Sequence, residues 1–403
     1  MQHPRRRARV AGARTRARQP ALRFAFSTLA TAAAVGATIH ALITTARVRR
    51  IEDAAPAPET PIRELVHVIV PARDEAAVID DCLRALRNQT HGRRRGAGGL
   101  HVVVVDDDSE DATAQIAGHH ARNDPRVHVV HTTGPPPGWT GKVHALAVGL
   151  EACPDAAAGW VLTVDADTVL AEDAVERLLA TAGAHDLDLL STPGGPPPAR
   201  SLTWPLLMPA ALGLISVYAS PDGRGRRAFA IGHCLLVHGT ALARVGGFKA
   251  LADRRGEDVA LATRVRDHQG RTRLIDGLDF VTTSGMDPLA AGWRSFRKSF
   301  VAATGNRAAI LAAGGLWQLL HAAVGPLLVL RGGGALARPV AFGLGLAAWG
   351  TQAVAHTHTA RLMRARPTLA VLAPASLAAS GVLLLDGART VLTGTNTWKR
   401  RRQ

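Results

Sequence analysis

The apolar residues of this chain are grouped in two ways. Near the start, residues 24–45 carry no charged side chain over about the length that spans a bilayer, and no small-residue cleavage site follows, so we expect an anchor rather than a removed signal. Near the end, residues 311–330, 340–356 and 369–385 form three further candidate spans. The middle of the chain has shorter apolar runs, which indicate a folded domain between membrane segments.

In this middle part, short β-rich runs alternate with stretches in which apolar residues recur at helical spacing. Such alternation predicts an α/β domain whose mostly parallel sheet is covered by helices on both faces. In sheets of this kind, ligands bind beyond the carboxyl ends of the strands. The expected strands are 66–70, 100–105, 127–131 and 160–164, and the expected helices are 78–86, 111–121 and 142–152.

A further apolar stretch, residues 202–218, contains Pro205 and Pro209, which argue against a membrane span there. We expect an interfacial helix or an apolar acceptor groove instead. The expected order along the chain is a basic, disordered tail (1–23), the anchor (24–45), a linker (46–65), the α/β domain (66–305), a C-terminal membrane region of two or three helices (311–392) and a basic tail (393–403).

The net charge of +16 on the 403 residues comes largely from arginines near the two ends. Because these basic clusters flank apolar segments, they are more typical of the cytoplasmic side of a membrane than of a nucleic-acid site. We therefore expect a membrane partner and no nucleic acid. The three cysteines show no zinc or disulfide spacing, and Cys82 is expected to be a core residue.

Carboxylates gather where the expected strands end. Asp165 and Asp167 follow one strand with a single small residue between them, so both side chains can share a face and hold a hard divalent cation, Mg²⁺ or Mn²⁺, and through it a diphosphate. Asp74, Glu75 and Asp107 follow two other strands, where carboxylates can accept hydrogen bonds from a base and a ribose. For the cluster at Asp107, helix capping is the structural alternative.

Two further candidates open helical patterns. Lys142 follows Gly141 at a helix start, where a lysine and free backbone N–H groups attract phosphate, although a solvated surface lysine is the alternative. Glu257 and Asp258 begin another helix, where acids also occur for dipole reasons alone.

The order of these motifs resembles that of the family 2 glycosyltransferases over residues 66–305. Residues 71–75 resemble the P-x-x-N-E motif, 106–113 the D-D-x-S-x-D-x-T motif, 141–149 the G-K-x-x-A-L-N-x-G motif with Ala147 in place of Asn, 165–167 the D-x-D motif, and Gly246-Gly-Phe248 with Glu257-Asp258 the G-G-F and E-D pair. Residues 138–142 and 396–399 further resemble a membrane-bound branch that acts on hopanoids and carotenoids.

The resemblance implies a GT-A nucleotide-diphospho-sugar transferase fold, Rossmann-like, with N- and C-terminal transmembrane helices. It implies metal-assisted, inverting transfer of one sugar from a nucleotide-sugar, expected to be a UDP-sugar, to a lipid acceptor of hopanoid, carotenoid or polyprenyl type. The Q-x-x-R-W motif of processive members is not found near residues 292–298, which argues for single-sugar transfer.

The site residues expected from these patterns fall into four groups. They are Asp258 as general base with Glu257 beside it; Pro71, Arg73, Asp74, Glu75, Asp107, Lys142 and Asp165 for the donor; Asp167 and Asp165 for the metal; and His233, Arg294 and Arg297 for the acceptor or a phosphate.

Two other functions stay open at this point. A polyprenyl-phosphate glycosyltransferase would need a basic pocket rather than a base at Asp258, and a non-catalytic membrane scaffold would need none of these acids. Because nucleotide sugars are cytoplasmic, we expect a multi-pass protein of the cell membrane whose α/β domain faces the cytoplasm. Three C-terminal spans would place residues 399–402 on the opposite side, against the positive-inside tendency, so the number of spans stays open.

Overall fold

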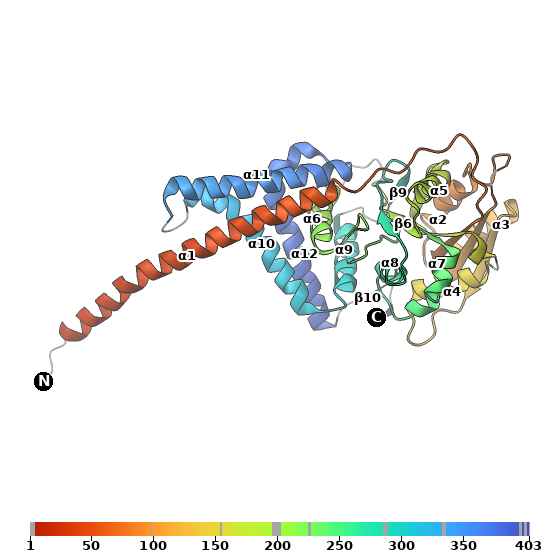
Figure 1. The fold of residues 1–403 in the computed structure, drawn as a ribbon. Helices are drawn as coiled ribbons and strands as arrows, with labels where there is room; N and C mark the ends of the chain where they lie inside the picture. The colour runs from red at the N-terminus through yellow and green to blue at the C-terminus, as the bar shows by residue number, and fades with distance from the viewer. Residues whose placement is uncertain are drawn as a thin grey trace.

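The structure is a computed structural model in which an α/β domain and a helical bundle lie side by side (Figure 1). The α/β domain begins with the first strand and ends near residue 284. The helical bundle is formed by the long helix before this domain and by the helices after residue 307. The structure describes residues 5–96, 98–153, 155–195, 203–224, 227–284, 289–332, 336–394, 397–398 and 401–402.

The core of the α/β domain is a seven-stranded sheet in the order β3-β2-β1-β4-β7-β6-β8. The first four strands in this order are parallel, β7 is antiparallel to both of its neighbours, and β6 is parallel to β8. The strands are β1 (Val66–Ala72), β2 (Leu100–Asp107), β3 (Val127–Thr132), β4 (Trp160–Val164), β6 (Leu189–Thr192), β7 (Cys234–His238) and β8 (Thr272–Leu274), and a separate antiparallel pair joins β5 (Thr168–Leu170) to β9 (Val281–Thr283). The mostly parallel sheet expected from the sequence is therefore confirmed.

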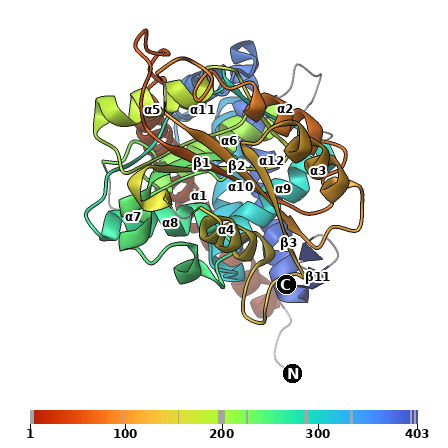
Figure 2. The ribbon, with the colours of Figure 1, turned by 90° about the vertical axis from the view of Figure 1, so that its right-hand side faces the viewer.

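Alternating side chains on each strand feed two apolar layers. On β1, Val68 and Val70 pack on one face and Ile69 on the other, and all three are fully buried. The first layer is formed with α2 (Ile79–Arg87), α3 (Thr113–Asn123) and α5 (Ala174–His185), and the second with α4 (Gly141–Glu151), α7 (Gly239–Arg244) and α8 (Glu257–Asp267). Figure 2 shows the α/β domain facing the viewer, with β1, β2 and β3 between the helices. Short 3₁₀ turns lie at Ala156–Ala158 and Phe248–Leu251.

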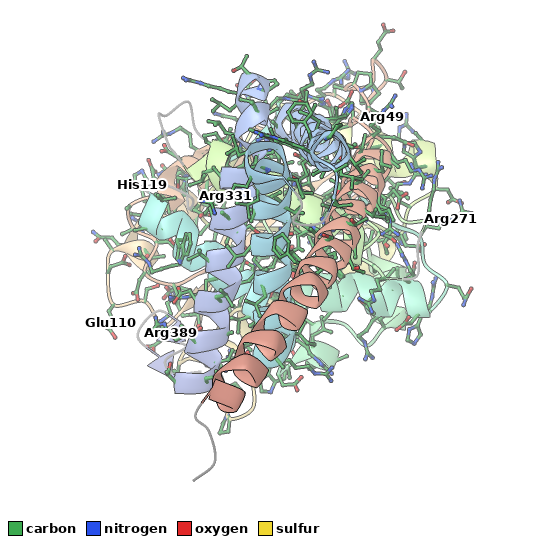
Figure 3. All side chains as sticks on the ribbon, turned by 90° about the vertical axis from the view of Figure 1, so that its left-hand side faces the viewer. Arg49, Glu110, His119, Arg271, Arg331 and Arg389 are labelled. Carbon is green, nitrogen blue, oxygen red and sulfur yellow. The ribbon has the colours of Figure 1, made fainter. Side chains whose placement is uncertain are left out.

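The bundle helices run beside one another, and α1 lies diagonally across the others with Arg49 just after its end (Figure 3). Their bounds are α1 (Arg5–Val48), α10 (Ala308–Arg331), α11 (Arg338–Leu362) and α12 (Ala373–Thr393), the last preceded by a 3₁₀ turn at Pro367–Leu372. Two helices, α6 (Thr203–Tyr218) and α9 (Leu289–Ala303), lie between the bundle and the α/β domain, and the short strands β10 (Thr397–Trp398) and β11 (Arg401–Arg402) pair near the C-terminus (Figure 1).

Three helical segments of the described chain are long and apolar enough to cross a membrane: Ala25–Val48, Ala308–Arg331 and Pro367–Thr393. The expected span at 340–356 is not one of them, because α11 carries polar residues such as Gln352 and His356. The expectation of a disordered tail over residues 1–23 is corrected from Arg5 onward, where α1 already begins.

The stretch 202–218 forms α6 with Pro209 inside the helix. Instead of lying open at an interface, α6 buries Trp204, Leu207 and Leu212 in a cluster shared with α1, α9 and α12. All three cysteines are buried and free, in agreement with the core position expected for Cys82.

Candidate functional site

A pocket opens at the edge of the sheet where β1, β2 and β4 end, which is the edge expected for ligand binding. Counting the space open to solvent, it encloses about 620 Å³. Six of the seven residues expected to bind the donor line this pocket, together with Asp167: they are Pro71, Arg73, Glu75, Asp107, Lys142 and Asp165.

Asp74, the seventh, is not among the lining residues and instead joins two loops. Its backbone has a φ of 51°, a left-handed conformation that Asp tolerates better than most residues. The Asp74 N–H donates to Ser109 Oγ at 3.1 Å, and the Glu110 N–H donates back to Asp74 Oδ1 at 2.9 Å. The loop after β1 is therefore tied to the loop after β2.

Two more bonds complete this connection, which we call the loop brace (residues 74–76 with 109–113). The Glu75 N–H donates to Thr113 Oγ1 at 2.8 Å, and the Ala76 N–H donates to Asp111 Oδ2 at 3.0 Å. Three consecutive amides of one loop thus bond to the side chains of the other. The hydroxyl and carboxyl groups of the 106–113 motif hold the pocket wall, and Arg73 adds a bond from Nη1 to the Asp107 carbonyl at 2.5 Å.

Lys142 lies at the centre of the site. Its Nζ is 2.7 Å from Asp165 Oδ1 and 2.7 Å from Glu257 Oε1, so it bridges the end of β4 and the start of α8. Burial opposes a positive charge here, but the two carboxylates raise the pKa of Lys142 well above its usual value. Burial would likewise raise the pKa of Asp165, but the charge of Lys142 holds that pKa below its usual value.

Asp167 lies on the same edge as Asp165. Its pKa is raised, first by burial and then by the negative charge of Asp165. A second cation near this pair would relieve that repulsion, and carboxylate oxygens are the ligands that Mg²⁺ and Mn²⁺ prefer. No cluster of three or more His, Cys, Asp or Glu suited to a metal occurs in the described part of the chain. Asp165 and Asp167 are the two carboxylates here that could hold such a cation.

Asp258 stands beside this ion-pair network as the second residue of α8. Its backbone neighbour, the Val259 N–H, donates to Asp258 Oδ1 at 2.8 Å. Burial, and then the charge of Glu257, raise the pKa of Asp258 to about 7. A carboxyl with that pKa is suited to accept a proton near neutral pH.

Gly232, just before β7, makes room for this arrangement. A Cβ at Gly232 would lie 2.9 Å from Lys142 Nζ, 3.4 Å from Asp258 Oδ2 and 3.4 Å from Glu257 Oε1. The next residue, His233, accepts two hydrogen bonds. The Asp165 N–H donates to the His233 carbonyl at 3.1 Å, and the Gly194 N–H donates to His233 Nδ1 at 3.1 Å. Because β7 runs antiparallel to β4, its first residues meet the end of β4, and His233 holds backbone there.

The two arginines expected to meet phosphate lie on α9 but do not line the pocket. Arg297 Nη1 donates to Asp386 Oδ2 of α12 at 2.8 Å, and Arg294 is exposed. A third basic residue of the same helix, Lys298, does line it. The sequence shows that Lys298 lies one helical turn after Arg294, in the same basic cluster. It does not show which basic residue of α9 lines the pocket.

Comparison with known proteins identifies this arrangement. The family model for glycosyl transferase family 2 matches residues 67–248, and that for glycosyl transferase family group 2 matches residues 160–379, which is more than half of the chain. An N-acetylglucosaminyltransferase of Bradyrhizobium sp. (strain ANU 289) is 30% identical over 162 residues, covering 37% of this chain and 98% of that protein. Another from Rhizobium leguminosarum bv. phaseoli is 32% identical over 143 residues, covering 35% of this chain and 30% of its own length.

The fold has a similar solved structure. A mannosyltransferase from Pyrobaculum calidifontis, in complex with GDP-Man and Mn²⁺, superposes with a TM-score of 0.54 at 22% identity, covering 94% of this chain and 99% of that one. The GT-A fold class expected from the sequence is confirmed. Together these matches show that the chain belongs to the family 2 glycosyltransferases, enzymes that transfer a sugar from a nucleotide-sugar donor.

Proposed function

We propose that the protein is a membrane-bound, inverting glycosyltransferase that moves one sugar from a nucleotide-diphospho-sugar, expected to be a UDP-sugar, to a hydroxyl group of a lipid. The observation that carries the proposal is that a basic side chain, a pair of carboxylates and a candidate general base lie together in one site. Lys142 can meet a diphosphate, Asp165 and Asp167 can hold a cation, and Asp258 has a pKa of about 7 beside them.

The reaction follows from these groups in one displacement. Asp258 accepts the proton of the acceptor hydroxyl while the hydroxyl oxygen attacks the anomeric carbon of the donor sugar. The bond from that carbon to the diphosphate breaks, and the electron pair leaves with the nucleoside diphosphate. Because the oxygen enters opposite the leaving group, configuration at the anomeric carbon inverts.

Lys142 supports departure of the nucleoside diphosphate. In the structure its ammonium is paired with Asp165 and Glu257. A diphosphate in the pocket offers Lys142 a more strongly charged partner, so the lysine can follow the negative charge that builds on the leaving group. A divalent cation held by Asp167 and Asp165 would supply further charge neutralisation there.

A hydroxyl acceptor fits better than the phosphate acceptor of a polyprenyl-phosphate glycosyltransferase. A phosphate is already ionised and needs no base, whereas the site keeps a half-buried carboxyl at Asp258 whose pKa is raised to about 7. The expected phosphate-binding pair is also not assembled, because Arg297 bonds to Asp386 and Arg294 is exposed. These contacts support a hydroxyl-bearing lipid, of which hopanoid and carotenoid types are the first to test.

The bundle supports a membrane location with the catalytic domain on the cytoplasmic side. Val48 at the end of α1 and Met363 after α11 share one apolar cluster with Leu274 of β8, so both helices end beside the α/β domain. Arg364 strengthens this junction through an ion pair with Asp276 of the α/β domain at 3.0 Å. α10 begins on the same side, close after α9.

The last helix, α12, packs along α10. A Cβ at Gly381 would lie 2.9 Å from the Gly315 carbonyl of α10, and a Cβ at Gly387 would lie 3.7 Å from Leu311, so the two helices are antiparallel. α12 therefore ends near the start of α10, and a Cβ at Gly387 would also lie 3.3 Å from Val301 Cγ2 of α9. The N-terminus of α1 lies at the far end of the bundle (Figure 1).

The test is release of nucleoside diphosphate by the full-length protein in lipid nanodiscs. We would offer a panel of UDP- and GDP-sugars with a lipid extract, with and without EDTA. Asp167→Ala is the site variant, and Asp267→Ala, an exposed acid at the opposite end of α8, is the matched control. We expect release that requires lipid, divalent metal and Asp167, and that Asp267→Ala leaves unchanged.

Product analysis separates the alternatives. An alkali-stable glycoside on a lipid hydroxyl supports the proposal, whereas an acid-labile sugar phosphate would establish the polyprenyl-phosphate function instead. Equal background release by wild type and Asp167→Ala with every donor would refute catalysis at this site.

A further inference from the structure

The helix α9 joins the donor pocket to the bundle. It lies between the α/β domain and the bundle (Figure 1), and its Lys298 side chain reaches the pocket wall that also contains Lys142, Asp165 and Asp167. Although Lys298 as a whole is exposed, desolvation by the surrounding protein and then the charge of Lys142 lower its pKa, while Glu257, Asp165 and Asp258 act in the opposite direction. The Lys298 ammonium therefore interacts electrostatically with the charged residues of the site.

A different face of α9 is attached to α12. Trp293 Nε1 donates to Asp386 Oδ2 at 3.1 Å and Arg297 Nη1 donates to the same oxygen at 2.8 Å. Trp293 and Arg297 are four residues apart and so share one face of α9, whereas Lys298 lies about 100° further round. Two bonds to one carboxylate thus hold α9 in the orientation in which Lys298 lines the pocket.

Asp386 is unusual in its sequence context. It is the only acidic residue from Ala308 to Thr393. An acid within a candidate membrane helix is costly unless it has partners, and Asp386 has three, because Arg389 of the same helix also donates to it at 2.9 Å. Its partners on α9 make it a connection between the membrane region and the catalytic domain.

We propose that Lys298 binds the diphosphate of the donor together with Lys142, and that Asp386 of α12 positions Lys298 through Arg297 and Trp293. This inference rests on the proposed donor chemistry of the site. Two lysines from different parts of the chain then share the charge of the leaving nucleoside diphosphate, one from α4 of the catalytic domain and one from a helix held by the bundle. The active site is completed only when α9 is docked on α12.

The first test compares Lys298→Met with Arg294→Met, its neighbour one turn earlier on α9. Both residues are exposed, so neither change should unfold the protein. We expect Lys298→Met to lower kcat/KM for the donor by about 100-fold, the size of loss typical for removing one charge-stabilising donor. It should also weaken binding of UDP with Mn²⁺, measured by calorimetry without any acceptor, and Arg294→Met should change neither value by more than about twofold.

The role of Asp386 is tested by a double-mutant cycle. Asp386→Asn and, from the other side of the contact, Arg297→Gln should each lower kcat/KM by about tenfold in the wild-type background and should have no further effect when Lys298 is already Met. A purely structural role would instead give losses that multiply. Because the cycle uses both partners of one contact, the variant that folds still tests the inference if the other folds poorly.

The outcomes separate this inference from the proposed function. If wild type is active and Lys298→Met matches it in kcat/KM and in UDP binding, the role of Lys298 is refuted while the glycosyltransferase assignment stands. If wild type transfers no sugar to any lipid but Lys298→Met still weakens UDP binding, the inference stands and the lipid acceptor is refuted.

Discussion

Replacing Glu257 with Gln should shift the pH dependence of sugar transfer toward acid. In the structure, burial and then the charge of Glu257 raise the pKa of Asp258 to about 7. A general base works only when deprotonated, so kcat/KM, which reports the free enzyme, should fall as pH drops through about 7 in the wild type. Removing the charge of Glu257 lowers the pKa of Asp258 and extends activity to lower pH.

The size of the shift follows from the geometry around Gly232. Asp258 Oδ2 and Glu257 Oε1 each lie 3.4 Å from the position of a Cβ on Gly232, so their separation cannot exceed the sum of these distances. At about 7 Å and an effective dielectric constant of about 20, two like charges repel by about 2.4 kcal/mol, equivalent to about 1.7 in pKa. Because Lys142 is paired with Glu257 and offsets part of its charge, we expect an observed shift of about one pH unit.

The assay is kcat/KM for the donor between pH 5 and pH 9, a range of roughly two units on either side of the expected midpoint. Glu151→Gln is the matched control, since Glu151 is an exposed carboxylate paired with Lys249 away from the site. The midpoint of the acid limb should move for Glu257→Gln and stay in place for Glu151→Gln. An unchanged midpoint in Glu257→Gln, or a wild-type acid limb that survives in Asp258→Asn, would refute the assignment of Asp258 as the base.

Three further changes test other parts of the structure. Gly232→Ala should raise the donor KM by about tenfold with little change in the melting temperature, because the new Cβ would displace the flexible Lys142 ammonium rather than backbone; an unchanged KM would contradict the role of this gap. Asp167→Asn should raise the Mn²⁺ concentration needed for half-maximal activity by about tenfold or more, measured by metal titration of EDTA-treated protein, and equal metal dependence would contradict the ligand role. Gly149→Ala should lower the free energy of unfolding of the catalytic domain by about 1–3 kcal/mol, because the new Cβ would overlap Ile69 Cγ2 in the core. Gly183→Ala, a helical position with open space around it, should be neutral or stabilising.

Local patterns predicted the elements of this fold well. The strand expected at 160–164 matches β4 in both bounds, and the other expected strands of the sheet begin where predicted. β1, β2 and β4 are largely buried on both faces, so their continuous apolar runs are distinctive in sequence. Helix ends moved by one or two residues, because capping depends on neighbours that a sequence pattern does not show.

The candidate site was only partly predictable, for a different reason. Asp165 and Asp167 could be placed at one edge because they share a strand end. The pairing of Lys142 with both Asp165 and Glu257 could not, since it depends on tertiary packing that brings the start of α8 to the end of β4. Likewise, the helical repeat places Arg297 and Lys298 on different faces of α9, but only the docking of α9 on α12 decides which face meets the pocket.

The loop brace has a consequence for the energetics of ligand capture. Because the amides of residues 74–76 are already bonded to Ser109, Thr113 and Asp111, the two loops that form the pocket wall move as one body. Ordering a free loop costs roughly 1–2 kcal/mol for each residue fixed, and here that cost falls on folding rather than on binding. A nucleotide sugar therefore meets a wall that is already shaped, and more of its contact energy remains available for distinguishing one base from another.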